Sequence, residues 1–201
     1  MSSVILLSGG MDSAYLARAF AVNAAFCLFV DYGQPSAERE AEAARSICSG
    51  TGIPLIERTI SGLSLGEMTD ASGVTGPRIV PARNALLCSL AANLATGKAD
   101  EVLIGCTMDD DQYPDCGLWF LDRISDALHA SCGVKVVAPL ARRRKLDVLK
   151  DCRDAQLMLW DSWSCYGPGP MPCGTCNSCV TRTRAVNAAG ILDPLMGSRA
   201  R

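Results

Sequence analysis

A serine- and glycine-rich stretch near the N-terminus combines residue types that bind phosphate groups. Residues 8–13 read Ser-Gly-Gly-Met-Asp-Ser; they follow the apolar run 4–7 and precede an amphipathic run, 14–24. This order predicts a buried strand, a tight turn and the start of a helix, where unpaired backbone N–H groups and the helix dipole attract anions. Glycine lets the backbone approach an anion closely. We therefore expect phosphate or pyrophosphate over the amides of the two glycines, with the two serine hydroxyls as further donors.

The stretch differs from the two commonest nucleotide-binding loops. No lysine follows its glycines, as the G-x-x-x-x-G-K-[ST] loop requires, and its glycine spacing does not match G-x-G-x-x-G. S-G-G-x-D-S at the end of a first strand resembles instead the pyrophosphate loop of the N-type ATP pyrophosphatases, which cleave ATP to AMP and pyrophosphate while adenylating an oxygen. The alternative interpretation is an ordinary helix N-cap at Ser8 or Asp12.

Four cysteines near the C-terminus have the spacing of a metal site. The pattern is C-x₇-C-x₂-C-x₂-C, in which each C-x-x-C pair supplies two ligands from one tight turn. Four thiolates complete a tetrahedron around Zn²⁺, so the metal would be structural and would bind no substrate water. An iron–sulfur cluster also uses four cysteines and is the alternative. The predicted ligands are Cys165, Cys173, Cys176 and Cys179.

Alternating strands and helices form the predicted framework that positions these residues. Predicted strands cover 4–7, 25–30, 54–59, 101–105 and 134–138, and predicted helices cover about 14–24, 36–49, 83–96, 118–132 and 145–159. This alternation predicts an α/β fold with a doubly wound, five-stranded parallel sheet and helices on both faces. Ligands of such sheets bind beyond the C-terminal ends of the strands. Asp31-Tyr32-Gly33-Gln34 follows the second strand and lies at the same edge as residues 8–13.

Charged residues elsewhere could reach that edge. Arg83 falls in the first turn of a predicted helix, where its planar fork suits an anionic ligand. The run 109–111 is three aspartates, which predicts either an Mg²⁺ site or a solvated loop. Among the four cations of 142–145, we expect Lys145 to face the phosphate edge; a basic surface patch is the alternative. The aperiodic stretch 60–79 is interpreted as a loop, either a lid over the site or a surface connection.

The composition limits the classes of protein to consider. The chain has 201 residues, 49% of them hydrophobic, and we expect a domain over 1–160 followed by a metal-binding module with a C-terminal helix over 161–201. Its formal net charge of −2 argues against broad electrostatic capture of nucleic acid. We see no signal peptide and no apolar run of the ~18 residues that cross a bilayer. The eleven cysteines, an odd number, predict a reducing compartment rather than a disulfide framework. We expect a cytoplasmic protein.

Taken together, these motifs resemble the 7-cyano-7-deazaguanine synthase (QueC) family, a branch of the N-type ATP pyrophosphatases. The matching stretches are 8–13, 31–34, 80–84, 113–116, 139–140 with Lys145, 163–167 and 172–182. The resemblance covers nearly the whole chain. It departs from the family pattern at Ala82, where the family usually has glycine, and at Gly117, where the family usually has arginine after Tyr-Pro-Asp-Cys.

The resemblance implies an ATP-dependent ligase of the adenine-nucleotide α-hydrolase (HUP) fold. Such an enzyme converts 7-carboxy-7-deazaguanine and free ammonia into the nitrile through adenylated acid and amide intermediates, with Mg²⁺ and a structural Zn²⁺, and forms a homodimer. The departures leave one alternative, a divergent relative that adenylates a different carboxylate, for DNA or protein modification or phage defence. An alternative of another class is a zinc-module binding protein, a nucleic-acid binder or scaffold, with an inactive nucleotide site.

The implied roles fall on residues already singled out. The catalytic set comprises Ser8, Asp12, Ser13, Lys145 and Arg83. The nucleotide would be bound by Leu7, Ser8, Gly9, Gly10, Met11, Asp12, Ser13, Asp31, Tyr32, Gly33 and Gln34. Tyr113, Trp119, Phe120 and Trp163 are candidates for stacking on the substrate ring, although core packing is the commoner use of such rings.

Overall fold

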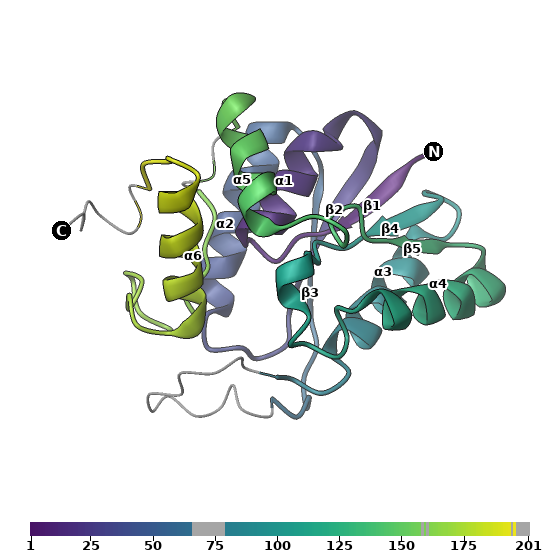
Figure 1. Cartoon of the computed structure of the whole chain (residues 1–201). Coiled ribbons are helices and arrows are strands. Elements are labelled where there is room, and N and C mark those ends of the chain that lie inside the picture. The colour runs from purple at the N-terminus through teal and green to yellow at the C-terminus, as the bar shows by residue number, and fades with distance from the viewer. Residues whose placement is uncertain (66–78, 158, 160, 194, 196–201) are drawn as a thin grey trace.

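A five-stranded parallel sheet forms the centre of the molecule (Figure 1). The computed structural model describes residues 1–65, 79–157, 159, 161–193 and 195. The strand order is β3-β2-β1-β4-β5, and every neighbouring pair is parallel, which confirms the predicted doubly wound sheet. The strands are β1 (Ser3–Leu6), β2 (Ala24–Asp31), β3 (Leu55–Thr59), β4 (Glu101–Leu103) and β5 (Lys135–Val137). Among the described residues, no helix is long and apolar enough to cross a bilayer.

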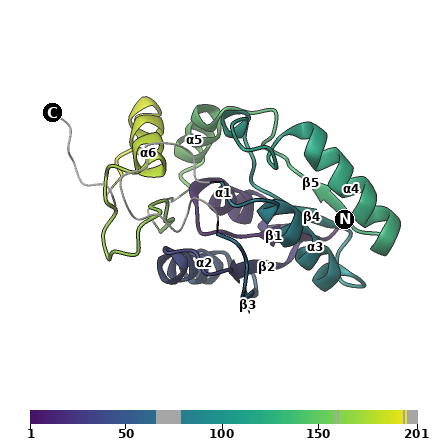
Figure 2. The same ribbon diagram turned by 90° about the horizontal axis from the view of Figure 1, so that it is seen from below.

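Helices cover both faces of the sheet (Figure 2). The helices are α1 (Met11–Ala19), α2 (Ala37–Thr51), α3 (Arg83–Ala95), α4 (Leu118–Cys132), α5 (Lys145–Asp154) and α6 (Asn177–Ala188), with 3-10 turns η1 (Ala21–Asn23) and η3 (Met108–Asp110). One apolar core joins the sheet to α1, α2 and α5, and a second joins it to α3 and α4. Because β1, β2 and β4 are buried or half-buried on both faces, their sequences are mostly continuous apolar runs rather than alternating ones. The edge strand β3 differs, since its residues 57–59 are polar and exposed.

The C-terminal helix belongs to the same core. Val186 and Ala189 pack in the cluster that contains residues of α1 and α5, and α5 and α6 lie side by side in both views of the ribbon (Figure 1, Figure 2). Trp163, Cys165 and Cys179 pack against Ala43 of α2. The cysteine-rich segment is thus fixed to the sheet domain by apolar contacts at two places.

Several predicted boundaries are wrong by a few residues, each for a local reason. α1 ends at Ala19 rather than near residue 24, because the chain tightens into η1 before β2 begins. α2 continues through Gly50 and ends at Thr51, and Gly52, with a φ of 73°, is its left-handed C-cap. α5 ends at Asp154 rather than near residue 159. Residues 66–78, most of the predicted loop or lid, lie outside the described residues.

Candidate functional site

The turn at residues 8–13 joins β1 to α1 at the C-terminal edge of the sheet. Gly10 is the N-cap of α1, and no side chain caps it, so the predicted alternative of a cap by Ser8 or Asp12 is wrong. The two serine side chains instead shape the turn: Ser13 Oγ donates to the Gly10 carbonyl at 3.0 Å and lies 3.2 Å from Ser8 Oγ. The first turn of α1 therefore keeps backbone N–H groups without a side-chain partner, which is the condition for binding an anion there.

Gly9 is required by the close approach of α2. Its φ is +77°, and a Cβ at this position would lie 2.6 Å from the Glu40 carbonyl oxygen. On the β4 side of the turn, Gly105 follows that strand, and a Cβ at Gly105 would lie 3.1 Å from the Ser13 nitrogen. The turn is thus enclosed by backbone on two sides, and a side chain at either glycine would displace it.

Residues 31–34 are organised by a buried carboxylate that the sequence analysis missed. Glu40 accepts hydrogen bonds of 2.8 Å from Gln34 Nε2 and from Ser36 Oγ, and Gln34 Oε1 accepts one of 2.9 Å from the Tyr32 amide. Burial raises the pKa of Glu40. Ser36 is the N-cap of α2 in position, but its hydroxyl binds Glu40 and caps no backbone group.

Lys145 approaches the turn from the start of α5. Its Nζ lies 2.9 Å from Asp12 Oδ2, and both side chains are largely buried. Burial raises the pKa of Asp12, with Asp110 acting in the same direction and Lys145 opposing it. Burial alone would lower the pKa of Lys145, but Asp12 and Asp110 outweigh it and raise the pKa above the ordinary lysine value. A charged ammonium is therefore held against the anion-binding turn.

A second cation, Arg83, lies in the first turn of α3, as predicted. Although burial lowers it, Tyr32 and Asp115 raise the pKa of Arg83 above its ordinary value. The Asn84 amide donates to Asp115 Oδ2 at 2.9 Å, so a carboxylate from a distant loop caps this helix. Ala82, the N-cap residue, has a φ of 55°, a left-handed conformation that favours glycine.

A cavity of about 260 Å³ brings most of the predicted site residues together. It opens at the point where the strand order reverses between β1 and β4, the usual ligand site of a doubly wound sheet. The predicted residues that line it are Leu7, Ser8, Gly10, Met11, Asp12, Ser13, Tyr32, Gln34, Arg83 and Lys145. Three other predicted residues belong to the same turns but do not line the cavity: Gly9, Asp31 and Gly33. The Gly33 amide donates to Asp31 Oδ1 at 2.8 Å.

The acidic run 109–111 fits neither predicted interpretation fully, because two of its carboxylates bind backbone. Asp109 Oδ2 accepts from the Lys145 amide at 2.6 Å and so caps α5. Asp110 Oδ2 accepts from the Thr107 amide and hydroxyl, and Asp110 also lines the cavity. Asp111 is exposed. This loop positions Lys145 by fixing the end of its helix.

The aromatic candidates separate into two groups. Tyr113 and Trp163 line the cavity, and the Tyr113 hydroxyl lies 3.1 Å from that of Tyr166, a cavity residue that the sequence analysis did not single out. Trp119 is 75% exposed on α4 and lies within reach of Arg123 there, and Phe120 packs on the second core. Gly117 is the N-cap of α4 and does not line the cavity.

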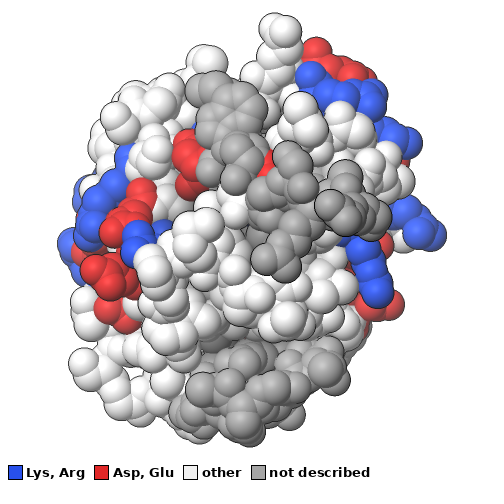
Figure 3. Space-filling model, turned by 90° about the vertical axis from the view of Figure 1, so that its left-hand side faces the viewer, with Lys and Arg blue, Asp and Glu red and all other residues white. Residues whose placement is uncertain are grey.

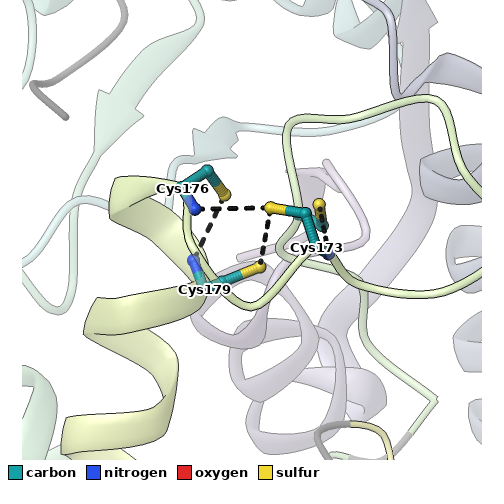
Figure 4. Close-up of side chains that lie close together, drawn as sticks. Cys173, Cys176 and Cys179 are labelled. Atoms are coloured by element: carbon teal, nitrogen blue, oxygen red, sulfur yellow. Dashed lines mark hydrogen bonds between the residues drawn. The ribbon is translucent and has the colours of Figure 1, made fainter. Parts of the chain in front are cut away.

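The four predicted cysteines converge on one point (Figure 4). Their sulfur atoms all lie within 4.8 Å of one another, and those of Cys173 and Cys179 are 4.0 Å apart. Sulfur ligands at Zn–S distances of ~2.3 Å are about 3.8 Å apart in a tetrahedron, so the arrangement fits one ion. A cluster of several irons would spread the sulfurs further, because each would bind a different iron.

Two of the four cysteines, Cys173 and Cys176, favour the thiolate, whereas the hydrogen bond to Cys176 raises the pKa of Cys179 and burial raises that of Cys165. A hydrogen bond from the Cys179 thiol, together with backbone donors of Tyr166 and Cys179, lowers the pKa of Cys176 to about 4. The Cys165 sulfur accepts from the amides of Gly167 and Cys173 at 3.3 Å. These donors stabilise the deprotonated form that metals bind.

The surface over α6 mixes charges of both signs. On the face shown in Figure 3, lysines and arginines lie beside aspartates and glutamates, and uncharged residues occupy most of the described area. This distribution agrees with the net charge of −2 and does not favour the nucleic-acid-binding alternative.

Comparisons with known proteins agree with this geometry. The family described as "Queuosine biosynthesis protein QueC" matches residues 2–190, a range that includes the turn at 8–13 and the four cysteines. A Methanosarcina mazei protein named 7-cyano-7-deazaguanine synthase is 32% identical, over 98% of both chains. One of the same name from Chlorobium phaeovibrioides is 34% identical, over 97% of this chain and 96% of the relative.

A solved structure shares the fold. NMN synthetase from Francisella tularensis superposes with a TM-score of 0.52 at 16% identity, covering 95% of this chain and 78% of the other. At this identity the likeness shows the fold alone, and it is the predicted HUP type of parallel sheet.

Proposed function

The chain belongs to the QueC family of queuosine biosynthesis proteins, and on that membership we propose that it is an ATP-dependent 7-cyano-7-deazaguanine synthase. Its substrates are 7-carboxy-7-deazaguanine, ammonia and ATP. The observation that carries this proposal is the cavity at the strand-order reversal, where an anion-binding turn and two partly buried cations, Lys145 and Arg83, line the same space.

The chemical difficulty is a poor leaving group. A carboxylate does not expel hydroxide, so ATP first converts the acid to an acyl-adenylate with release of pyrophosphate. Ammonia displaces AMP and gives the amide. A second ATP activates the amide oxygen, and loss of AMP and a proton leaves the nitrile. The balance is one acid, one ammonia and two ATP to one nitrile, two AMP and two pyrophosphate, with no covalent enzyme intermediate.

The residues of the cavity divide this work. The amides of the turn 8–13 hold the departing pyrophosphate, because they combine free N–H groups with the positive end of α1. Lys145 neutralises charge that develops on the phosphates, and Asp12 holds its ammonium in place. Arg83 supplies a second cation from the α3 side, with a planar fork suited to an anion.

Mg²⁺ would be held by the carboxylates of the same cavity together with the phosphates. Asp12 and Asp110 both line it, and Mg²⁺ prefers one or two carboxylate oxygens in addition to substrate phosphates and water. The cation would neutralise the pyrophosphate as it leaves.

The four cysteines would hold a structural Zn²⁺. Their sulfur spacing fits one tetrahedral ion, and four thiolates leave no position for a catalytic water. The metal stabilises the segment that carries Trp163 and Tyr166 to the cavity wall.

Two further proposals rest on family membership. The first is that free ammonia is the nitrogen source. We also propose that the enzyme is a homodimer.

The test is product analysis with purified protein. Incubation with 7-carboxy-7-deazaguanine, an ammonium salt, Mg²⁺ and ATP should release AMP and pyrophosphate and form the nitrile, which mass spectrometry detects. If no nitrile forms and another carboxylate stimulates AMP release, the assignment of 7-carboxy-7-deazaguanine as the substrate is wrong. Two outcomes would overturn the proposal that the protein is an enzyme of this kind. One is AMP release that does not depend on any added carboxylate, and the other is no AMP release under any condition.

A further inference from the structure

Arg182, on α6, is a buried arginine whose partners lie mostly outside its own helix. Its side chain is about 2% exposed and forms an ion pair of 2.6 Å with Asp193. Its Nη1 donates to the Ser162 carbonyl at 2.9 Å and to the Ser164 hydroxyl at 3.2 Å, and its Nη2 donates to the Leu159 carbonyl at 3.2 Å. One guanidinium thus fixes the backbone of the segment around 162–164.

That segment lies directly against the anion-binding turn. The Trp163 amide donates to the Gly9 carbonyl at 2.8 Å, and Trp163 and Ser164 line the cavity. Asp161, just before them, forms an ion pair of 2.6 Å with Arg18 of α1. The turn 8–13 is therefore supported on one side by a loop that Arg182 holds in place.

We propose that Arg182 is a positioning residue that sets the shape of the pyrophosphate turn, acting through Trp163 and Gly9. This inference rests on the proposed function, since it assigns to that site a support far along the chain. The Ser8 and Ser13 hydroxyls shape the turn from within, whereas the Gly9 carbonyl is oriented from outside the turn, by the Trp163 amide. An arginine is suited to this task because its rigid fork can serve several backbone oxygens at once.

The position of Arg182 also links the turn to the cysteine site. Arg182 follows Cys179 by three residues on α6, and the Cys176 side chain accepts from the Cys179 amide at the start of that helix. Order at the N-terminus of α6 therefore fixes the helix that carries the guanidinium.

The experiment compares two conservative variants of arginines that α6 depends on. Arg182→Lys keeps the charge beside Asp193 but loses the fork. Arg153→Lys is the matched control, because Arg153 Nη1 donates to the Ala189 carbonyl at 2.8 Å and so ties the other end of α6 to α5 without touching 162–164. Three quantities are measured: the Kd of Mg-ATP by calorimetry, the KM values for ATP and for the carboxylate, and hydrogen exchange of the Trp163 amide.

We expect Arg182→Lys to raise the Kd and the KM of ATP about tenfold, as for the net loss of one or two hydrogen bonds. The KM of the carboxylate should stay within twofold, and the Trp163 amide should exchange faster. Arg153→Lys should leave all of these unchanged. An unchanged Kd in folded Arg182→Lys, or an equal effect in both variants, would overturn the proposal.

Ser162→Ala keeps the test decisive if Arg182→Lys does not fold. It removes a hydroxyl that accepts from Arg182 Nη1 at 3.0 Å and donates to the Leu159 carbonyl, and it leaves the arginine intact. We expect the Kd of ATP to rise about fivefold, within the range for the loss of one or two hydrogen bonds, and no change would again contradict the role. If the wild type itself binds no Mg-ATP, the proposed function fails; if it binds and the variants bind equally well, only the role of Arg182 fails.

Discussion

The Lys145 ammonium lies 2.9 Å from the Asp12 carboxylate, across 133 positions of sequence, at the mouth of the turn that follows β1. The pair is largely buried, and the Asp109 carboxylate caps the helix that begins at Lys145. Residues 8–13 contain no lysine or arginine, and Lys145, at the start of α5, supplies the cation instead.

Replacing Lys145 by methionine should remove most activity. The change preserves much of the apolar stem and deletes the charge that opposes developing negative charge on the phosphates, so kcat/KM should fall about 100- to 1,000-fold. Steady-state assays of AMP release measure this. Lys150→Met is the matched control, since Lys150 is exposed on the same helix. Wild-type kinetics in Lys145→Met, with the fold intact by circular dichroism, would remove Lys145 from the site.

The titration of Asp12 should appear in the pH dependence of stability. Because burial raises its native pKa above the ordinary 3.8, the folded state holds this proton more tightly than the unfolded chain. The stabilising contribution is complete below 3.8 and is lost as the pH rises through the raised native pKa. The free energy of unfolding of the wild type, measured relative to Asp12→Asn, should therefore fall across that interval.

Denaturant unfolding at a series of pH values supplies this comparison. Asp126→Asn, which changes an exposed carboxylate on α4, provides the baseline. Curves for wild type and Asp12→Asn that run parallel from pH 3 to pH 8 would contradict the burial of a titrating Asp12.

Loss of the metal should destabilise the protein as a whole. A structural Zn²⁺ contributes its binding free energy to folding, so chelation or Cys176→Ser should lower the free energy of unfolding by at least about 3 kcal/mol and the Tm by about 10 °C. Differential scanning calorimetry and metal analysis measure both effects. Cys132→Ser is the control, because the Cys132 thiol only donates to the Leu128 carbonyl of its own helix. An unchanged Tm after metal removal would argue against a structural site.

Ala82→Gly should stabilise the protein. Ala82 has a φ of 55°, and the left-handed region costs an alanine about 1 kcal/mol that glycine does not bear. Because glycine also gains entropy in the unfolded chain, we expect a net gain of at most about 1 kcal/mol in chemical denaturation. Ala85→Gly, inside α3, should instead destabilise by about 1 kcal/mol. A loss of stability in Ala82→Gly would show that the methyl group makes contacts that outweigh the strain.

The strained residue also bears on the two departures from the family pattern. A glycine at position 82 would adopt the left-handed backbone there with less strain than alanine. Ala82 does not line the cavity, so the departure affects the free energy of the backbone and leaves the cavity lining unchanged. Gly117 lies outside the lining as well, and a Cβ there would meet open space. Neither position narrows the cavity, which agrees with the assignment of the chain to the QueC family.

Features that depend on neighbours along the chain can be predicted from the amino-acid sequence. An apolar run ending in two glycines and a serine can only be a strand, a turn and a helix start, and regular alternation of such runs fixes a parallel sheet. The C-x-x-C spacing fixes the metal cluster for the same reason, since tight turns bring their two sulfurs together. Arg83 was placed correctly because a helix start is a local signal.

Which distant residues complete the site depends on how the helices pack against the sheet and against one another. Glu40 is part of a polar helix in sequence, and its burial against Gln34 depends on how α2 packs behind the turn. Asp109, read as a metal ligand or a solvated residue, proved to cap the helix of Lys145. Arg182 reaches 162–164 only because α6 packs beside α5. Burial and long-range hydrogen bonds arise from packing between elements, and no pattern within one element encodes them.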